Sequence, residues 1–306
     1  MKAILSSPMR RELQALVARP VAWEAPLAAH TSLRIGGPAE AVVTVEDCVE
    51  IAAVLGFARR RAVPWRVLGK GSNVLVADDG LAGMTLMLGD AFCRLGKISA
   101  QEVVAGAASA LPALSHFCQE NGLAGLEFAA GIPGSVGGAV VMNAGAFGGQ
   151  IADSLSALEL CTEDGPHTLP ATELRFAYRA WLDAQKWCGQ AVITGVRFTL
   201  REDDPAAIAA RIKEYQRLRR LGQPHGAANA GSFFKNPPGD SAGRLIDTCG
   251  LKGMRVGDAM VSPDHANFLV NTGGATAADM RELARLVCEA VYNRHGVQLE
   301  QEVETW

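Results

Sequence analysis

The segment GSFFKNP at positions 231–237 holds three side chains that can bind a substrate or move a proton. They are the hydroxyl of Ser232, the ammonium of Lys235 and the amide of Asn236. Alternate side chains of an extended chain point to the same side, so Ser232 and Asn236 would share one face and Lys235 would lie on the other. The spacing indicates a site in which a hydroxyl lies beside an amide, although a loop serine can also have a purely structural role.

Charged residues that could take part in a functional site occur in two other segments. Tyr178 and Arg179 lie in LRFAYRAW, and the planar guanidinium of a fixed arginine suits a carboxylate or a phosphate. The alternative is a packing pair. Near residue 300, Glu300, Glu302 and Glu304 would share one face of a strand, with Val297, Leu299 and Val303 on the other face. The alternative is a solvated strand face.

A second serine, Ser241, lies in the pattern GDSAG, which matches the nucleophile motif GxSxG. That motif requires a buried strand directly before the serine, whereas Asn-Pro-Pro precedes it here. Ser241 is therefore better explained as the N-cap of a short helix.

Glycine-rich loops form a further set of candidates. In GKGSN (69–73), successive backbone N–H groups could form a nest for phosphate oxygens, or the loop could be a tight hairpin. It is not a dinucleotide fingerprint, because valine occupies position 74, where the third glycine would be. The segments GIPGSVGG (131–138) and NAGAFG (143–148) add a second cluster. Together the loops favour an extended ligand such as a dinucleotide, with a close-packed turn as the alternative.

Composition limits the classes of protein. The 306 residues include 29 Lys+Arg and 32 Asp+Glu, a net charge of −3, and 49% are hydrophobic. A disordered chain and a dedicated nucleic-acid binder are excluded, since the first needs fewer apolar residues and the second a basic excess. The seven cysteines are scattered without metal-ligand spacing, so we expect reduced thiols in a cytoplasmic protein and no metal. The uncharged stretch 128–152 is rich in glycine, which favours buried loops over a membrane span.

The elements that must position these residues alternate between strands and helices, which predicts an α/β or α+β protein. Asp47 and Thr276 are expected to cap helices, and Asp204-Pro205 to open one. The predicted helices cover 9–19, 48–61, 109–121, 205–220 and 277–295, and the predicted strands 40–46, 65–69, 74–77, 84–88, 101–104, 156–162, 191–200 and 297–303.

Taken together, these motifs resemble the UDP-N-acetylenolpyruvoylglucosamine reductase (MurB) family along nearly the whole chain. The matching stretches are HTSLRIGG (30–37), LGKGSNVLVADDG (68–80), GLEFAAGIPGSVGGAVVMNAGAFG (125–148), FAYR (176–179), NAGSFFKNP (229–237), AGRLIDTCGLKG (242–253), VSPDHANFLVN (261–271) and LEQEV (299–303). The short interval between FAYR and NAGSFFKNP resembles the subclass that lacks an inserted tyrosine-bearing loop. Departures from the family pattern are Lys70, Trp181 and Gln301.

The resemblance implies an α+β fold. An FAD-binding domain of the vanillyl-alcohol-oxidase or PCMH type would span 28–200, with subdomains of about 28–80 and 81–200. A substrate domain would span 205–306, and its last strand, 297–306, would return to the first subdomain. We expect a cytoplasmic monomer.

The resemblance also implies a reaction. NADPH would reduce non-covalently bound FAD, which would reduce UDP-N-acetylglucosamine enolpyruvate to UDP-N-acetylmuramate, a peptidoglycan precursor. Arg179, Ser232 and Glu302 match the catalytic residues, with Ser232 as proton donor. The implied cofactor residues are Arg34, Gly69, Gly71, Ser72, Asn73, Gly131, Ile132, Pro133, Gly134, Ser135, Gly137, Asn143 and Gly145. The implied substrate residues are Tyr178, Arg220, Asn236 and His265.

Overall fold

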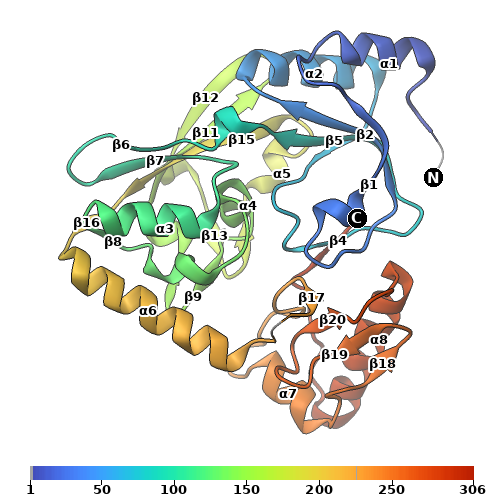
Figure 1. Cartoon of the computed structure of the whole chain (residues 1–306), viewed down its shortest axis with the longest axis vertical. Coiled ribbons are helices and arrows are strands. Elements are labelled where there is room, and N and C mark those ends of the chain that lie inside the picture. The colour runs from blue at the N-terminus through green and yellow to red at the C-terminus, as the bar shows by residue number, and fades with distance from the viewer. Residues whose placement is uncertain (1–2, 225) are drawn as a thin grey trace.

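A computed structural model describes residues 3–224 and 226–306 of the chain. Its first lobe, residues 7–88, is a four-stranded sheet covered by helices (Figure 1). The strand order is β1-β2-β5-β3, in which only β1 is antiparallel to its neighbour. The elements are α1 (Ser7–Gln14), β1 (Ala22–Pro26), β2 (Pro38–Val45), α2 (Cys48–Arg61), β3 (Trp65–Val67), β4 (Val74–Leu75) and β5 (Leu81–Leu88).

One feature of this lobe follows from local sequence, and another depends on contacts between distant segments. The Asp47 carboxylate accepts the Glu50 N–H at 2.8 Å, so the predicted N-cap of α2 is confirmed. Strand β5 inserts between β2 and β3, so the first sheet extends past the subdomain boundary expected at residue 80. A parallel strand can join a sheet far from its neighbours in sequence, and composition does not mark that junction.

The second lobe, residues 95–202, contains a five-stranded antiparallel sheet of order β12-β11-β15-β7-β6. The uncharged stretch 128–152 lies beside it as short, largely buried elements, and no helix of the described residues is long and apolar enough to cross a membrane. The main elements are β6 (Leu95–Lys97), β7 (Glu102–Gly106), α3 (Leu111–Glu120), β8 (Leu123–Ala124), α4 (Val136–Val141), β9 (Gly145–Ala146), β10 (Gly149–Gln150), β11 (Leu155–Thr162), β12 (Gly165–Pro170), β13 (Phe176–Ala177), β14 (Ala180–Trp181), α5 (Ala184–Trp187), β15 (Ala191–Thr199) and β16 (Arg201–Glu202).

Helix α3 starts two residues later than predicted. Its N-cap is Ala110, because the Ser109 hydroxyl donates to the Arg94 carbonyl at 3.2 Å instead of capping the helix. Pro112 in its first turn is compatible with this start, since the missing N–H has no partner inside the helix.

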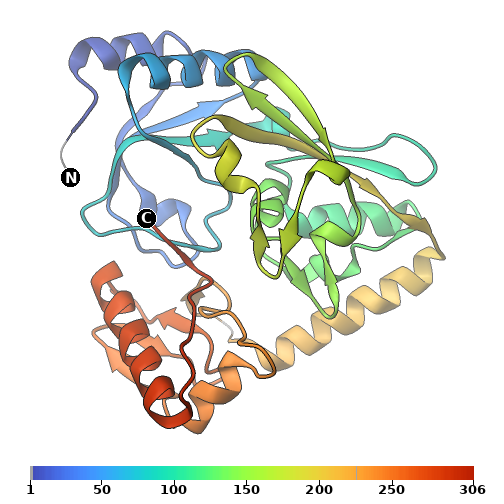
Figure 2. The same ribbon diagram turned by 180° about the vertical axis from the view of Figure 1, so that it is seen from behind.

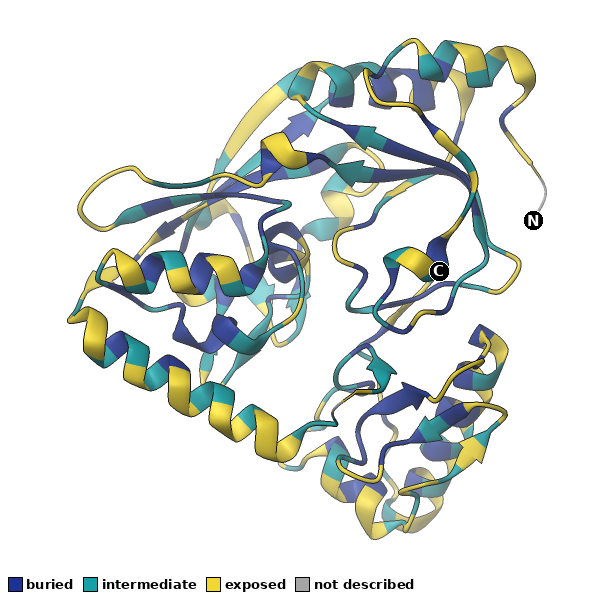
Figure 3. Cartoon of the chain, in the orientation of Figure 1, coloured by how far each residue is buried: buried dark blue, intermediate teal, exposed yellow. Residues whose placement is uncertain are grey.

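Helix α6 (Pro205–Gly222) runs along the second lobe and leads into the third (Figure 1). The third lobe, residues 228–305, has an antiparallel sheet of order β17-β20-β19-β18 packed against helices. Its elements are β17 (Ala228–Asn229), α7 (Ala242–Thr248), β18 (Arg255–Val256), β19 (Ala259–Val261), β20 (Leu269–Asn271), α8 (Ala277–His295) and β21 (Glu304–Thr305). The strands and the inner faces of the helices are buried, while the outer helix faces are exposed (Figure 3).

The predicted N-cap of α8 is confirmed. Thr276 and Asp279 form a reciprocal capping box, and Gly296 ends the helix in the left-handed region at φ 69°. The Asp78 carboxylate of the first lobe also accepts the N–H groups of Ala277 and Ala278 at 2.7 and 3.0 Å. Helix α8 is therefore fixed to the first lobe at its N-terminal end.

The segment after α8 returns to the first lobe (Figure 2). Strand β21 pairs in parallel with β4, and the Asn73 side chain donates to the Glu302 carbonyl at 3.0 Å. The continuous strand predicted for 297–303 is wrong. The backbone of this segment contacts the loop Phe233–Lys235 instead. The Glu302 N–H donates to the Phe233 carbonyl at 2.8 Å, and Gln301 forms a single isolated β-bridge with Phe234 rather than a continuous strand pairing.

Candidate active site

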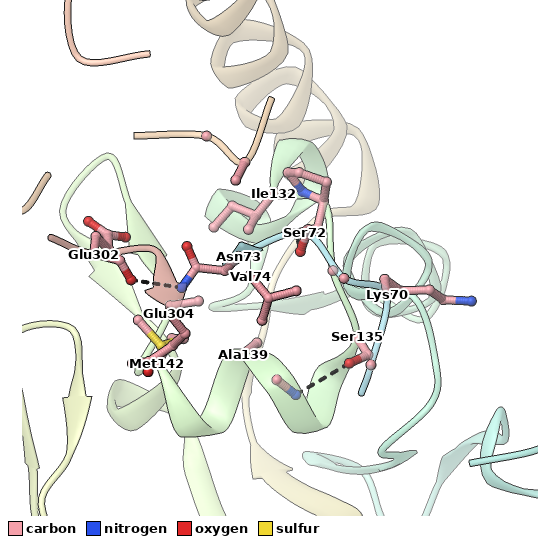
Figure 4. A pocket seen from close by; sticks show the side chains of 18 of the residues that line it. Lys70, Ser72, Asn73, Val74, Ile132, Ser135, Ala139, Met142, Glu302 and Glu304 are labelled. Carbon is pink, nitrogen blue, oxygen red and sulfur yellow. Dashed lines mark hydrogen bonds between the residues drawn. The ribbon is translucent and has the colours of Figure 1, made fainter. Parts of the chain in front are cut away.

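A cavity of about 320 Å³ lies where the three lobes meet (Figure 4). Its wall combines the loop before β4, the loop before α4, the hairpin turn at Arg179, the end of α6 and the returning segment. Many residues predicted for the site line it: Gly69, Gly71, Ser72, Asn73, Ile132, Pro133, Gly134, Ser135, Gly145, Arg179, Ser232 and Glu302.

One side of the cavity, here called the glycine-loop wall, consists of residues 69–73 and 131–135. The two loops are in contact, because the Ser72 hydroxyl donates to the Pro133 carbonyl at 2.9 Å. A Cβ at Gly69 would lie 2.4 Å from Ser135 Oγ, and a Cβ at Gly71 (φ +61°) would lie 1.9 Å from the His30 carbonyl oxygen. Glycine is thus required for the backbone to approach this closely, and the backbone remains accessible to a ligand.

The opposite side, here called the charged wall, consists of Arg179, Ser232 and Glu302. Arg179 lies in the turn between β13 and β14 with φ 57°, a strained conformation for a residue with a side chain. Its Nη2 donates to the Gly145 carbonyl at 2.9 Å, and its Nε lies 2.9 Å from Glu302 Oε1. The guanidinium is thereby oriented from two directions.

Glu302 is held through its backbone rather than by a helix or a sheet. Its N–H donates to Phe233 and its carbonyl accepts from Asn73, which joins the third lobe to the glycine-loop wall. Burial raises the pKa of its carboxyl, and the positive charges of Arg179 and Lys235 act in the opposite direction. The balance leaves an acid that is more easily protonated than a surface glutamate.

Ser232 follows Gly231, which has φ 78°, and lies half-buried on the cavity wall. The predicted alternation along this segment is wrong, because the rings of Phe233 and Phe234 are both buried and meet edge to face at 5.3 Å. Asn236 consequently does not line the cavity. Its Oδ1 accepts the Ala242 N–H at 3.0 Å at the start of α7.

Comparisons with known proteins match two parts of the chain to protein families. Residues 39–168 match the FAD binding domain family, and residues 223–306 match the C-terminal domain of UDP-N-acetylenolpyruvoylglucosamine reductase. UDP-N-acetylenolpyruvoylglucosamine reductase 2 of Symbiobacterium thermophilum is 44% identical over 98% of this chain and 97% of its own. The reductase of Moorella thermoacetica is 43% identical over 96% of both chains.

The chain belongs to the UDP-N-acetylenolpyruvoylglucosamine reductase family. A solved structure of the enzyme from Thermus caldophilus superposes with a TM-score of 0.79 at 41% identity, and covers 94% of this chain and 98% of its own. The α+β fold with an FAD-binding domain is therefore confirmed.

FAD is the cofactor of this reductase-family chain. The glycine-loop wall lies within the matched residues 39–168, and its glycines leave backbone groups open toward the cavity. Such a surface suits the pyrophosphate of a dinucleotide, which needs backbone N–H donors and close approach. Lys70 does not disturb it, since the lysine is exposed and its ammonium points away from Asn73 and Glu302 (Figure 4).

Four residues with a predicted cofactor role do not line the cavity. Arg34 is exposed with φ 56°. Gly137 packs against Ala107, where a Cβ would lie 3.0 Å from the alanine Cβ, and Gly131 lies under Arg219. The Asn143 side chain is engaged with the chain itself, because it bonds Gln150, Ala152 and the Ala177 carbonyl at 3.0 Å each.

Three further residues with a predicted substrate role also lie outside the cavity lining. Tyr178 is half-exposed beside Arg179, whose Cζ lies 5.0 Å from the tyrosine ring centre, and Arg220 is exposed on α6. His265 lies in the third lobe against Phe268, and burial lowers its pKa. Phe268, rather than His265, reaches the cavity.

The sequence reasoning missed Arg219 and Gln223, which line the cavity from the last turn of α6 and the residue after it. Their spacing of four residues could have indicated a shared site, because residues four apart lie on the same face of a helix. The departure Trp181 is buried in the core of the second lobe and packs on Phe176 at 6.4 Å, so it supports the turn that carries Arg179.

Two other predictions concern chemistry outside the cavity. The Ser241 hydroxyl accepts the Arg244 N–H at 3.2 Å, so the N-cap interpretation is confirmed. Across the described residues, no group of three or more His, Cys, Asp or Glu side chains could hold a metal ion.

Proposed function

We propose that this chain reduces the enolpyruvyl group of UDP-N-acetylglucosamine enolpyruvate to give UDP-N-acetylmuramate, with NADPH as the reductant. The observation that carries the proposal is the Arg179–Glu302 pair, with Ser232, in a cavity whose other wall belongs to the FAD-binding domain. The relatives from Symbiobacterium thermophilum and Moorella thermoacetica are named as reductases of this enolpyruvyl nucleotide, which supports the same substrate.

The reaction needs groups that bind an anion and deliver a proton. FAD, which residues 69–73 and 131–135 would hold, would supply hydride chemistry at the terminal vinyl carbon of the substrate, with NADPH as the source of the hydride. Addition there leaves negative charge on the adjacent carbon and in its carboxylate. The planar guanidinium of Arg179 suits that carboxylate, and one well-placed group of this kind is worth roughly 3 to 4 kcal/mol in the transition state.

Glu302 and Ser232 complete the assignment. Glu302 keeps the Arg179 guanidinium in one orientation and, because burial raises its pKa, can share a proton with the substrate. Ser232 is the proton donor to the carbanionic carbon. A hydroxyl is a weak acid, but this carbon is a strong base, so a positioned serine is sufficient.

We further propose a domain division at about 200–205, with 28–200 as the FAD-binding domain and 205–306 as the substrate domain that returns a strand to the first. The two family matches, 39–168 and 223–306, support it, as does the pairing of β21 with β4. A cytoplasmic location is part of the proposal, supported by seven free cysteines. A monomeric state is a further part of it. Analytical ultracentrifugation would test the monomer, and a single species at twice the mass of 32.2 kDa would contradict it.

The test follows the flavin through both half-reactions. The purified protein should be yellow, should bleach anaerobically on addition of NADPH, and should regain its colour with the enolpyruvyl nucleotide. Ser232→Ala should be reduced at the parent rate but reoxidised about 10²–10⁴-fold more slowly, as for loss of a general acid. The control is Ser241→Ala, which removes a hydroxyl on the exposed N-cap of α7.

Two outcomes would contradict the proposal. A protein that stays colourless when FAD is offered does not hold a flavin on the glycine-loop wall. Reoxidation of Ser232→Ala at the parent rate would remove Ser232 from the mechanism while leaving the reductase activity intact.

A further inference from the structure

The short segment between α4 and β9, residues 143–145, contacts the β13–β14 hairpin at two points. The Asn143 side chain donates from Nδ2 to the Ala177 carbonyl at 3.0 Å. Two residues further along both segments, the Gly145 carbonyl accepts from Arg179 Nη2 at 2.9 Å. The first contact holds the backbone where the turn begins, and the second holds the guanidinium that projects from it.

The Asn143 amide is fully used within the chain. The residue is buried, at 1% exposure. Its two amide hydrogens serve two acceptors at 3.0 Å each, the Ala177 carbonyl and Gln150 Oε1. Its Oδ1 accepts the Ala152 N–H, also at 3.0 Å. Because the side chain is buried and both of its donors are engaged, Asn143 acts on the chain itself rather than on a bound cofactor.

The turn that carries Arg179 needs support from the rest of the chain. Arg179 has φ 57°, in the left-handed region, which costs a residue with a side chain roughly 1 to 3 kcal/mol and persists only where the surroundings enforce it. Strands β13 and β14 are two residues long each. A two-stranded hairpin of this length is not stable alone, so its contacts with neighbouring segments fix its position.

We propose that Asn143 is a positioning residue for Arg179. By holding the Ala177 carbonyl, Asn143 fixes where the turn begins, and therefore where the Arg179 guanidinium lies in the cavity. The inference rests on the proposed function, in which Arg179 binds the carboxylate of the enolpyruvyl group. A misplacement of about 1 Å can slow a reaction roughly 10²-fold, so a hydrogen bond outside the cavity can control the rate inside it.

Two substitutions at Asn143 separate its hydrogen bonds. Asn143→Gly removes the whole amide, and glycine adopts the φ of 40° found at this position without strain. Asn143→Asp keeps an oxygen for the Ala152 N–H, but an ionised carboxylate cannot donate to the Ala177 carbonyl. The matched control is Gln150→Ala, which removes the other acceptor of the Asn143 amide and leaves the bond to Ala177. Thermal unfolding of each holoenzyme shows whether the fold is retained.

We expect flavin reoxidation by the enolpyruvyl nucleotide to slow about 10- to 100-fold in both Asn143 variants, because the guanidinium is no longer held in place. FAD affinity and the rate of flavin reduction by NADPH should stay at the parent values, and Gln150→Ala should be reoxidised at close to the parent rate. The decisive measurement combines Asn143→Gly with Arg179→Lys. Since Asn143 acts through Arg179, its loss should slow the Arg179→Lys enzyme by less than about threefold more.

Three results would overturn the inference. Both Asn143 variants could be reoxidised at the parent rate, the two substitutions could slow the double variant by the product of their separate factors, or loss of the amide could weaken FAD binding as much as it slows reoxidation. The last two would make Asn143 a structural support with no specific link to Arg179. Failure of the proposed function looks different, since the parent protein would then lack bound flavin or turnover, or Arg179→Lys alone would keep full activity.

Discussion

The glycine-loop wall and the charged wall face the same cavity but are built in different ways. The first is made of backbone from two short loops, 69–73 and 131–135, in which side chains are excluded by contacts such as Gly71 with His30. The second is made of side chains from three segments far apart in sequence, around residues 179, 232 and 302. Substitutions that add side-chain atoms should therefore disrupt the glycine-loop wall. Substitutions that remove or displace side-chain atoms should disrupt the charged wall.

The largest effect is expected on the charged wall, from Arg179→Lys. Lysine keeps the charge but loses the planar fork, so it cannot bind Gly145, Glu302 and a carboxylate together. We expect flavin reoxidation by the enolpyruvyl nucleotide to slow about 10²–10³-fold, with reduction by NADPH little changed. Stopped-flow absorbance measures both steps. Arg217→Lys on the exposed face of α6 is the control, and full activity of Arg179→Lys would refute the carboxylate role.

A smaller effect is expected on the glycine-loop wall, from Gly71→Ala. The new Cβ would collide with the His30 backbone oxygen, so the loop must shift, and FAD affinity should fall roughly 10- to 100-fold at a strain of about 1 to 3 kcal/mol. Gly148→Ala is the matched control. Gly148 also has positive φ (+84°), but a Cβ there meets nothing within 4 Å. Flavin fluorescence titration gives the affinities, and equal losses in both variants would show that backbone strain, rather than collision, sets the effect.

The smallest effect is a pH dependence of stability due to Glu302. Because its pKa in the folded protein is raised above the ordinary 4.5, its contribution to stability is greatest at low pH and is lost as pH rises through the folded pKa. The difference in free energy of unfolding, parent minus Glu302→Gln, should therefore decrease with rising pH. Urea titrations at several pH values would measure it. A difference that grows with pH would mean that the pairing with Arg179 outweighs burial.

Local signals in the sequence predicted the parts of the molecule that depend on local contacts. The capping residues Asp47, Ser241 and Thr276 each bond an N–H three residues ahead, so the pattern alone located the helix starts. The glycine loops were also visible, because their glycines are needed for close backbone approach. Family motifs predicted roles for Arg179 and Glu302 but did not show that the two side chains form a pair.

Other features depend on contacts between segments far apart and could not be read from local pattern. Asn236 lies four residues after Ser232, yet it bonds the start of α7 because both phenylalanines between them are buried. The sequence does not distinguish Arg219 from the other arginines of α6. Its position at the cavity depends on the contacts of α6 with Phe147 and Gly131. The return of residues 300–306 to β4 is a pairing between distant segments that the resemblance, rather than the pattern, led us to expect.

The hydrogen bond between Asn73 and Glu302 joins residues 229 positions apart, which has a consequence for how the chain matures. During synthesis the segments that form the glycine-loop wall leave the ribosome long before Glu302 is made, at about 5 to 20 residues per second. A nascent chain can therefore assemble much of its flavin-binding surface while it still lacks the glutamate that orients Arg179. A chain that ends before the third lobe would therefore lack Glu302, and with it the carboxylate that pairs with Arg179.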